Sequence, residues 1–455
     1  MRESVPQGRT AGAVPRAALA FTECLAGLGY RRLPPGPLLA GDGGTTLFTS
    51  VAAPAWRRLL TGHPRPEPGG AVVLQWVLNT SRLASLPPAS PPSVQRAVGA
   101  VWTGVRPYRQ ALCDVLDALR EAGTPPGELT FALRTEPQDR VPVMTALRAL
   151  GVEPGRIIRG ARLPDAPVRM DPELGPCLTL RRRSRGPVFA HCDGLCPCGC
   201  HVSVAHIQFV ERRRTAGHVT ALRRPLFEMI ASEHALMHGV PGGSPAPGGP
   251  KAPVPPLLGP LSARIAELLA TAGGTAGPSP VFLADVSSAA SLLLGEGMAP
   301  GPRGGPYVLR RLIRMIGTEL AVHGLPPALL TSVIATAELV YRAPLGFPEL
   351  SARSWVHMTE ERDAFLKVLR RGRNRLLRPG ALSDRPGEAA RQLTRLRSER
   401  GVPLALSLRW CREAGVEPSL VHLALADVLD EALLSAPPAP TGTAPPPRPA
   451  PGLRI

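Results

Sequence analysis

The chain of 455 residues and 48.0 kDa is long enough for two or three domains, and its 44% hydrophobic content supports buried cores. Its net charge of +18 and pI near 10.9 indicate either a polyanionic partner or the arginine-rich usage of a GC-rich genome, since Lys251 and Lys367 are the only lysines. No apolar run reaches about 18 residues and no secretory leader pattern opens the chain. We therefore expect a cytoplasmic protein without a membrane partner, whose eight cysteines are thiols or metal ligands rather than disulfides.

Taken in order, the residue pattern predicts five parts. Residues 1–15 are expected to be flexible, and residues 16–240 combine predicted helices with alternating strands such as the one at 71–83. The Pro/Gly/Ser-rich stretch 241–255 predicts a linker. Residues 256–435 are expected to be mainly helical, and the Pro-rich tail 436–455 to be disordered.

The stretch GEGMAPGPRGGPYVLRRLIR (295–314) places a Pro/Gly loop before an amphipathic helix. On a helical wheel its apolar residues share one face, while Arg310, Arg311 and Arg314 fall on the opposite side. From the charge pattern alone, such a face is either solvated or contacts nucleic acid.

This stretch resembles the region of alanyl-tRNA synthetases that follows their catalytic domain, where a run ending in GRGYVLRRIIRRA contacts the tRNA acceptor stem. Further segments are similar to the same family: 33–62 resembles the opening of the catalytic domain, and FPELSARSWVHMTEERDAFLKVLRRGRNRLL (347–377) resembles the later helices. The resemblance implies an α+β fold, with a class II synthetase-like antiparallel sheet flanked by helices and followed by a mainly helical domain. No segment resembles the family's editing zinc motif or its C-terminal coiled coil.

The family's reaction is ATP-dependent alanylation of tRNA, and the resemblance implies where its catalytic residues would fall. Two phosphate-binding arginines of the family correspond to Asn79 and Ser232, and the ammonium-binding aspartate corresponds to Pro225. The remaining positions lie on segments with matching flanks and carry small or apolar residues: Ala97, Val202 and Ser203. Because activation needs fixed cations at the phosphates, we expect ordinary alanine adenylation to be lost, and ATP with Mg²⁺ to bind only if activity survives.

The tRNA-recognition positions are altered as well. The family's base-reading Asn and Asp correspond to Pro302 and Ser398, which cannot reproduce recognition of a minor-groove G:U pair. Basic and aromatic residues compatible with phosphate contact are retained at Arg303, Tyr307, Arg310, Arg311 and Arg314. The resemblance thus implies tRNA binding without sequence reading, and no DNA partner.

A cysteine cluster, HCDGLCPCGCH (191–201), needs separate consideration. Cys192, Cys196, Cys198 and Cys200 have C-x3-C-x-C-x-C spacing, which suits either a structural zinc or free thiols. Both alternatives stay open at the level of sequence.

Three hypotheses follow for the whole chain. It is a degenerate synthetase paralogue that binds tRNA or a protein partner, an active ligase with a remodelled pocket for another carboxylate or acceptor, or a structural module that uses the fold for protein contacts. The retained YVLRRLIR face favours the first hypothesis over the third, and the altered ATP positions favour it over the second.

Overall fold

The structure is a computed structural model. Its chain divides into two compact units, Met1–Arg362 and Asp363–Ile455. The residues that it describes are 16–39, 68–78, 92–159, 171–183, 201–215, 218–237, 254–273, 279–378, 380, 382–383 and 385–415.

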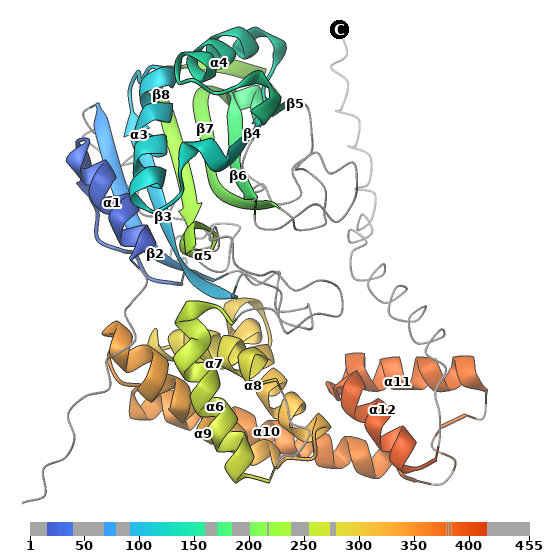
Figure 1. Cartoon of the computed structure of the whole chain (residues 1–455). Helices are drawn as coiled ribbons and strands as arrows, with labels where there is room; N and C mark the ends of the chain where they lie inside the picture. The colour runs from blue at the N-terminus through green and yellow to red at the C-terminus, as the bar shows by residue number, and fades with distance from the viewer. Residues whose placement is uncertain are drawn as a thin grey trace, which may run out of the picture. The chain divides into compact units, whose positions relative to one another are not determined.

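Eight described strands of the first unit form one sheet in the order β1-β2-β3-β8-β7-β6-β4-β5 (Figure 1). They are β1 (Tyr30–Arg32), β2 (Gly69–Leu78), β3 (Val94–Thr103), β4 (Leu129–Arg134), β5 (Ile157–Arg159), β6 (Cys177–Arg183), β7 (His201–Thr215) and β8 (His218–Ser232). The inner strands pair antiparallel, whereas the edge strands β1 and β5 run parallel to their neighbours β2 and β4. The predicted α+β fold with a mainly antiparallel sheet is confirmed.

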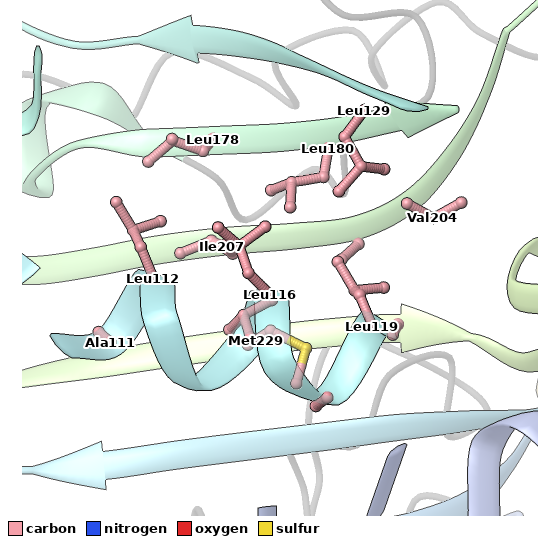
Figure 2. Packing of buried hydrophobic residues seen from close by; sticks show 14 of the residues in the cluster. Ala111, Leu112, Leu116, Leu119, Leu129, Leu178, Leu180, Val204, Ile207 and Met229 are labelled. Carbon is pink, nitrogen blue, oxygen red and sulfur yellow. The ribbon is translucent and has the colours of Figure 1, made fainter. Parts of the chain in front are cut away.

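One face of this sheet carries the core of the sheet region. Leu112, Leu116 and Leu119 of α3 lie against Leu180 and Ile207 of the strands, and all five are buried (Figure 2). The helices that cover this face are α1 (Ala17–Gly27), α3 (Tyr108–Glu121) and α4 (Pro137–Ala149). The packing follows from the period-2 alternation of the strands, which turns every second side chain toward the helices.

The alternating positions on the opposite face of the sheet carry polar side chains. Gln75 of β2, Gln95 of β3, Thr179 of β6 and Gln208 of β7 all lie there and are buried. A buried polar group is costly unless it is hydrogen-bonded, and these groups have partners; the Gln75 amide, for example, donates to the carbonyl of Gly36 at 2.8 Å. The face opposite the helices is therefore a built polar surface.

The rest of the first unit is helical, as predicted. Every residue of α7 from 282 to 294 is buried, which suits a helix that is apolar or small on all sides. Leu283, Leu293, Leu309 and Leu320 belong to one core cluster with the neighbouring helices. These elements are α6 (Gly259–Thr271), α7 (Pro280–Gly295), α8 (Gly304–Val322), α9 (Leu330–Ala337) and the π-helical turn η7 (Glu338–Arg342), followed by α10 (Ala352–Leu376).

Buried contacts join the sheet to these helices. Asp285 of α7 accepts hydrogen bonds from the backbone N–H of Ser93 at 2.7 Å and from its hydroxyl at 2.8 Å. Glu296 accepts from the backbone N–H of Leu38 at 2.7 Å. Trp76 of β2 packs edge-on against Tyr341 of η7, with ring centroids 6.3 Å apart. The sheet and α6–α9 are accordingly parts of one compact unit.

The second unit contains the later part of α10 with α11 (Pro386–Arg400) and α12 (Leu404–Glu413). Ala390, Leu393 and Cys411 form its small buried cluster. Gly372 of α10 lets Val402 approach closely, because a Cβ added there would lie 2.6 Å from a Val402 methyl group.

Several predictions fall on residues that the structure does not describe, namely 1–15, most of 241–255 and 416–455. The predicted domain limits stay predictions; the boundary between the two compact units falls between Arg362 and Asp363 in the sequence. Among the described helices, the segment Pro327–Leu345 is long and apolar enough to cross a membrane by length and composition alone, with a mean hydropathy of 1.2. Its residues Leu330, Val333 and Ile334 are buried in the helical core.

Candidate functional site

Two of the family-implied catalytic positions meet in the sheet. Ala97 of β3 and Ser232 of β8 are direct cross-strand partners. The Ser232 hydroxyl donates a hydrogen bond of 2.5 Å to Oε1 of Gln95, which lies two residues from Ala97 on the same face of the strand. The position that corresponds to a phosphate-binding arginine is thus a neutral hydroxyl held by a neutral amide.

Arg96, which lies between Gln95 and Ala97 in the sequence, is on the opposite face of the strand and is engaged there. Arg96 of β3 forms an ion pair with Glu233, the first residue of α5 (Glu233–Met237), and its Nε donates to Oε2 at 2.7 Å. The Glu233 side chain is fully buried, and this burial raises the pKa of its carboxyl although the positive charge of Arg96 opposes the rise. The Arg96 guanidinium also lies over the Trp76 ring, 5.9 Å from its centroid. Its charge is therefore balanced inside the protein.

The other implied catalytic positions are spread over the sheet. Val202 and Ser203 lie on β7 near the Ser232 end, since Ala205 pairs with Ala231 further along the same strands. Pro225 lies seven residues from Ser232 on β8, about 23 Å away along an extended strand. Its carbonyl accepts a hydrogen bond of 2.9 Å from the backbone of Gly104. Asn79 lies outside the described residues, directly after the end of β2.

A titratable group, His206, lies on the polar face of the sheet, the face that also carries Thr179 and Ser232. Thr179 Oγ1 and His206 Nδ1 are 3.0 Å apart, and Arg181 of β6 is buried nearby. Burial, together with the positive charge of Arg181, lowers the pKa of His206 to about 4. The imidazole is consequently neutral at physiological pH.

The amphipathic helix predicted after the Pro/Gly loop is α8. Leu309, Leu312 and Ile316 are fully buried on its apolar face, as expected from the sequence. The loop needs glycine at Gly301, because a Cβ there would lie 2.6 Å from Pro306 Cβ. The sequence GPRGGP therefore fixes where the helix begins.

The basic side of α8 divides into two groups. Arg303, Tyr307 and Arg311 are exposed. Arg303 is the extended residue that directly precedes the helix, and Tyr307 and Arg311 lie four residues apart on one side of it, about 6 Å apart along the axis. The Arg303 and Arg311 side chains have no partner among the described residues. We call Arg303, Tyr307 and Arg311 the α8 edge.

Arg310 and Arg314, in contrast, turn toward α10. Their Nε atoms lie 3.3 Å and 2.6 Å from the two carboxylate oxygens of Glu361, whose side chain is only 8% exposed. The three predicted arginines of this helix are therefore not equivalent. Arg311 faces solvent, while the charges of Arg310 and Arg314 are partly neutralised within the protein.

The cysteine cluster lies outside the described residues, so the zinc and free-thiol alternatives both stay open. Among the residues that the structure describes, no group of three or more His, Cys, Asp and Glu side chains is arranged to hold a metal ion. Cys177 is buried, and burial raises the pKa of its thiol to about 12, which keeps it uncharged.

Sequence reasoning missed Arg96, Glu233 and Glu361. Each acts through a partner 47 or more residues away, so its role depends on tertiary packing and no local pattern indicates it. The run EERDAFLKVLRR begins with two adjacent glutamates, Glu360 and Glu361, and the sequence does not indicate which of them faces α8.

The mainly antiparallel sheet and the α8 region have the arrangement expected from the resemblance noted in the sequence, and comparison with known sequences shows to which proteins part of the chain is similar. A segment of 146 residues is 32% identical to alanine–tRNA ligase of Mycobacterium tuberculosis, covering 30% of this chain and 16% of that protein. A 142-residue segment is 33% identical to alanine–tRNA ligase of Mycobacterium sp. (strain KMS), covering 29% and 15%. The sequence matches no protein-family model. The predicted resemblance to alanyl-tRNA synthetases is confirmed over part of the chain, and the matched segment spans about a sixth of those relatives.

Solved structures similar to the chain include histidyl-tRNA synthetase of S. aureus, with a TM-score of 0.33 and 11% identity over 52% of this chain and 69% of that one. Another is the RNA binding domain of threonyl-tRNA synthetase from Cryptosporidium parvum Iowa II, with a TM-score of 0.32 and 11% identity over 50% of this chain and 66% of that one. At such scores, the fold assignment rests on the strand order and pairing of the chain itself.

Proposed function

We propose that this synthetase-like chain binds tRNA through its helical region and does not activate alanine. The observation that carries the proposal is the α8 edge, the exposed residues Arg303, Tyr307 and Arg311. They lie at the start of the helix whose sequence is similar to that of alanyl-tRNA synthetases. Guanidinium groups match phosphate oxygens in a bidentate way, and an exposed tyrosine ring offers a stacking surface.

The described sheet residues support the loss of alanine activation. Ser232 and Gln95 are neutral, and Arg96 is paired with the buried Glu233. A pyrophosphate leaving group develops negative charge that fixed cations must stabilise, and each lost donor of this kind typically costs about 2.7–4 kcal/mol. Losing both arginine contacts removes roughly 5–8 kcal/mol of transition-state stabilisation on this basis. The residues present thus do not fit the ATP chemistry of the family, and no reaction step is assigned to them.

Alanine-dependent ATP–pyrophosphate exchange tests the first half of the proposal. We expect purified protein to give no exchange above a no-enzyme blank. Exchange with alanine would contradict the proposal outright. Exchange with a different acid, found by screening, would favour a ligase with a remodelled pocket.

Binding of a tRNA transcript at several salt concentrations tests the second half. Replacing Arg303 and Arg311 by Ala should weaken binding and lower the slope of log K against log salt by about 1.4–1.8, because each phosphate contact contributes roughly 0.7–0.9. A matched control is Arg120→Ala with Arg264→Ala, which removes the same charge from exposed sites on α3 and α6. If both double variants bind alike, the α8 edge is a solvated surface and the structural-module hypothesis gains.

The same proposal places the protein in the cytoplasm, with RNA rather than DNA or membrane as its partner. Transfer RNAs that differ only by G:U or G:C in the acceptor stem should bind within about tenfold of each other, a difference of roughly 1.4 kcal/mol. The reason is that Pro302 and Ser398 offer no amide or carboxylate to the minor groove. A larger preference for G:U would show that other residues read the base pair.

A further inference from the structure

The described part of the second unit, residues 363–415, is rich in positive charge. Residues 363–415 carry 13 Lys and Arg against 5 Asp and Glu, a net charge of +8 in 53 residues, whereas the whole chain has +18 in 455. Within this segment, residues 364–383 contain six basic residues and no acidic residue. A concentration of this kind raises the local potential and attracts polyanions.

Three of the basic residues of α10 lie on one side of the helix, whereas Arg373 lies on another side and pairs with Glu413. Lys367, Arg371 and Arg375 are spaced by four residues, so they lie within roughly 80° of arc and rise by about 6 Å each. Arg378 lies two residues beyond the end of the helix. All four residues are exposed. We call Lys367, Arg371 and Arg375 the α10 stripe.

No described acidic side chain balances the stripe. Glu413 of α12 is occupied by Arg373 at 3.3 Å and by Arg409 at 2.9 Å. The side chains of the α10 stripe have no hydrogen-bond or ion-pair partner among the described residues. Like charges four residues apart destabilise a helix, so the free protein carries a local repulsion that a bound polyanion would relieve.

The apolar side of the same helix segment is already used. Phe365 and Leu369 are buried, and Gly372 packs against Val402. A membrane-binding helix needs an exposed apolar face opposite its basic face, and these residues are not available for that purpose. The surface fits a charged and hydrated partner instead.

We propose that the α10 stripe is an RNA-binding surface, separate from the α8 edge, that contacts successive phosphates of the RNA backbone without reading sequence. The inference rests on the proposed tRNA-binding function. It adds a second set of contacts in the second unit, and their salt dependence can be measured independently of the α8 edge. Contacts of this kind fix position and supply affinity, while leaving base identity unread.

The test compares full-length proteins in tRNA binding between 50 and 300 mM salt. The variant Lys367→Ala/Arg371→Ala/Arg375→Ala should bind at least about tenfold more weakly, and its log–log salt slope should fall by about 2 to 3 for three lost phosphate contacts. Because alanine favours helix and the substitutions remove like-charge repulsion, the variant should fold at least as well as the wild type, which circular dichroism checks. A triple variant with Gln in place of Ala gives a second neutral surface.

The charge-matched control is Arg120→Ala/Arg148→Ala/Arg264→Ala, which removes three exposed arginines from α3, α4 and α6. If the stripe variants bind tRNA like this control, the inference is wrong even when the α8-edge variant still loses affinity. If the α8-edge variant is unaffected and the stripe variants lose affinity, the inference stands and the placement of the proposed function on α8 fails. If the stripe variants lose binding to heparin and to tRNA equally, the stripe binds phosphate-like polyanions without reading sequence, as proposed. If they bind tRNA like the wild type but lose binding to an acidic protein, the inference is wrong.

Discussion

Glu361 offers a sharp test of how the basic residues of α8 are used. This side chain lies between Arg310 and Arg314 and is 8% exposed, while the two arginine side chains are 30% and 23% exposed. We expect Glu361→Gln to destabilise the protein and, at the same time, to strengthen tRNA binding. The two effects have opposite signs because one carboxylate both stabilises the packing of α8 with α10 and neutralises two potential phosphate ligands.

The magnitudes follow from this geometry. Breaking a buried ion pair on one side costs roughly 3–5 kcal/mol, and the partial exposure of both arginines reduces the expected loss in unfolding free energy to about 2 kcal/mol. If both arginines then reach phosphates, the salt slope of tRNA binding should steepen by about 1.4–1.8. At 0.1 M salt each new contact should tighten binding about fivefold or more.

Urea unfolding and tRNA titration of the same preparations measure the two effects. The matched control is Glu360→Gln, which changes the net charge equally but replaces a neighbouring side chain that is 71% exposed. If Glu361→Gln binds tRNA no better than Glu360→Gln, Arg310 and Arg314 do not lie within reach of the RNA. If it also unfolds like the control, the ion pairs with Glu361 contribute nothing to stability.

Three further outcomes are expected. Between pH 7 and pH 4.5, His206→Gln should lose about 2 kcal/mol less unfolding free energy than the wild type. The pKa of His206 is about 4 in the folded protein, so the unfolded chain binds the proton first and the stability of the wild type falls as the pH falls. An equal loss of unfolding free energy in both proteins, measured by urea denaturation at the two pH values, would contradict this. Asp285→Ala should lower the unfolding free energy by about 3 kcal/mol in urea denaturation, since it leaves two buried donors of Ser93 without their acceptor; a change below about 0.5 kcal/mol would show that water replaces the carboxylate. Metal analysis should find at most one zinc per chain and less in Cys196→Ala; equal metal content in both proteins would remove Cys196 from the site, and metal-free wild type would favour free thiols.

The sequence carried enough information for the elements that depend on local pattern. The alternation in AVVLQWVLNTSRL predicted the strand that is β2, and the apolar spacing from Val308 to Leu320 predicted the buried face of α8. Long-range pairing could not be predicted in the same way. Whether an arginine of α8 faces solvent or Glu361 depends on how α10 packs beside α8. Arg310 and Arg311 are adjacent in the sequence, yet Arg310 faces Glu361 and Arg311 faces solvent. The Arg96–Glu233 pair likewise joins residues that are 137 positions apart.

The contacts of the sheet with α6–α9 have a consequence for the stability of the helices. The core cluster of the helices includes Leu38, Leu78 and Val94, which belong to the sheet region. Removing the sheet would expose apolar surface of the helices to water, at a free-energy cost of roughly 25 cal/mol per Å². It would also leave Asp285 and Glu296 without the backbone and hydroxyl donors that they now accept from. The helices therefore depend on the sheet for their stability, whatever chemistry the sheet performs. The apolar positions of the strands are constrained by the packing of the helices, whereas the polar positions on the opposite face of the sheet are not constrained in this way.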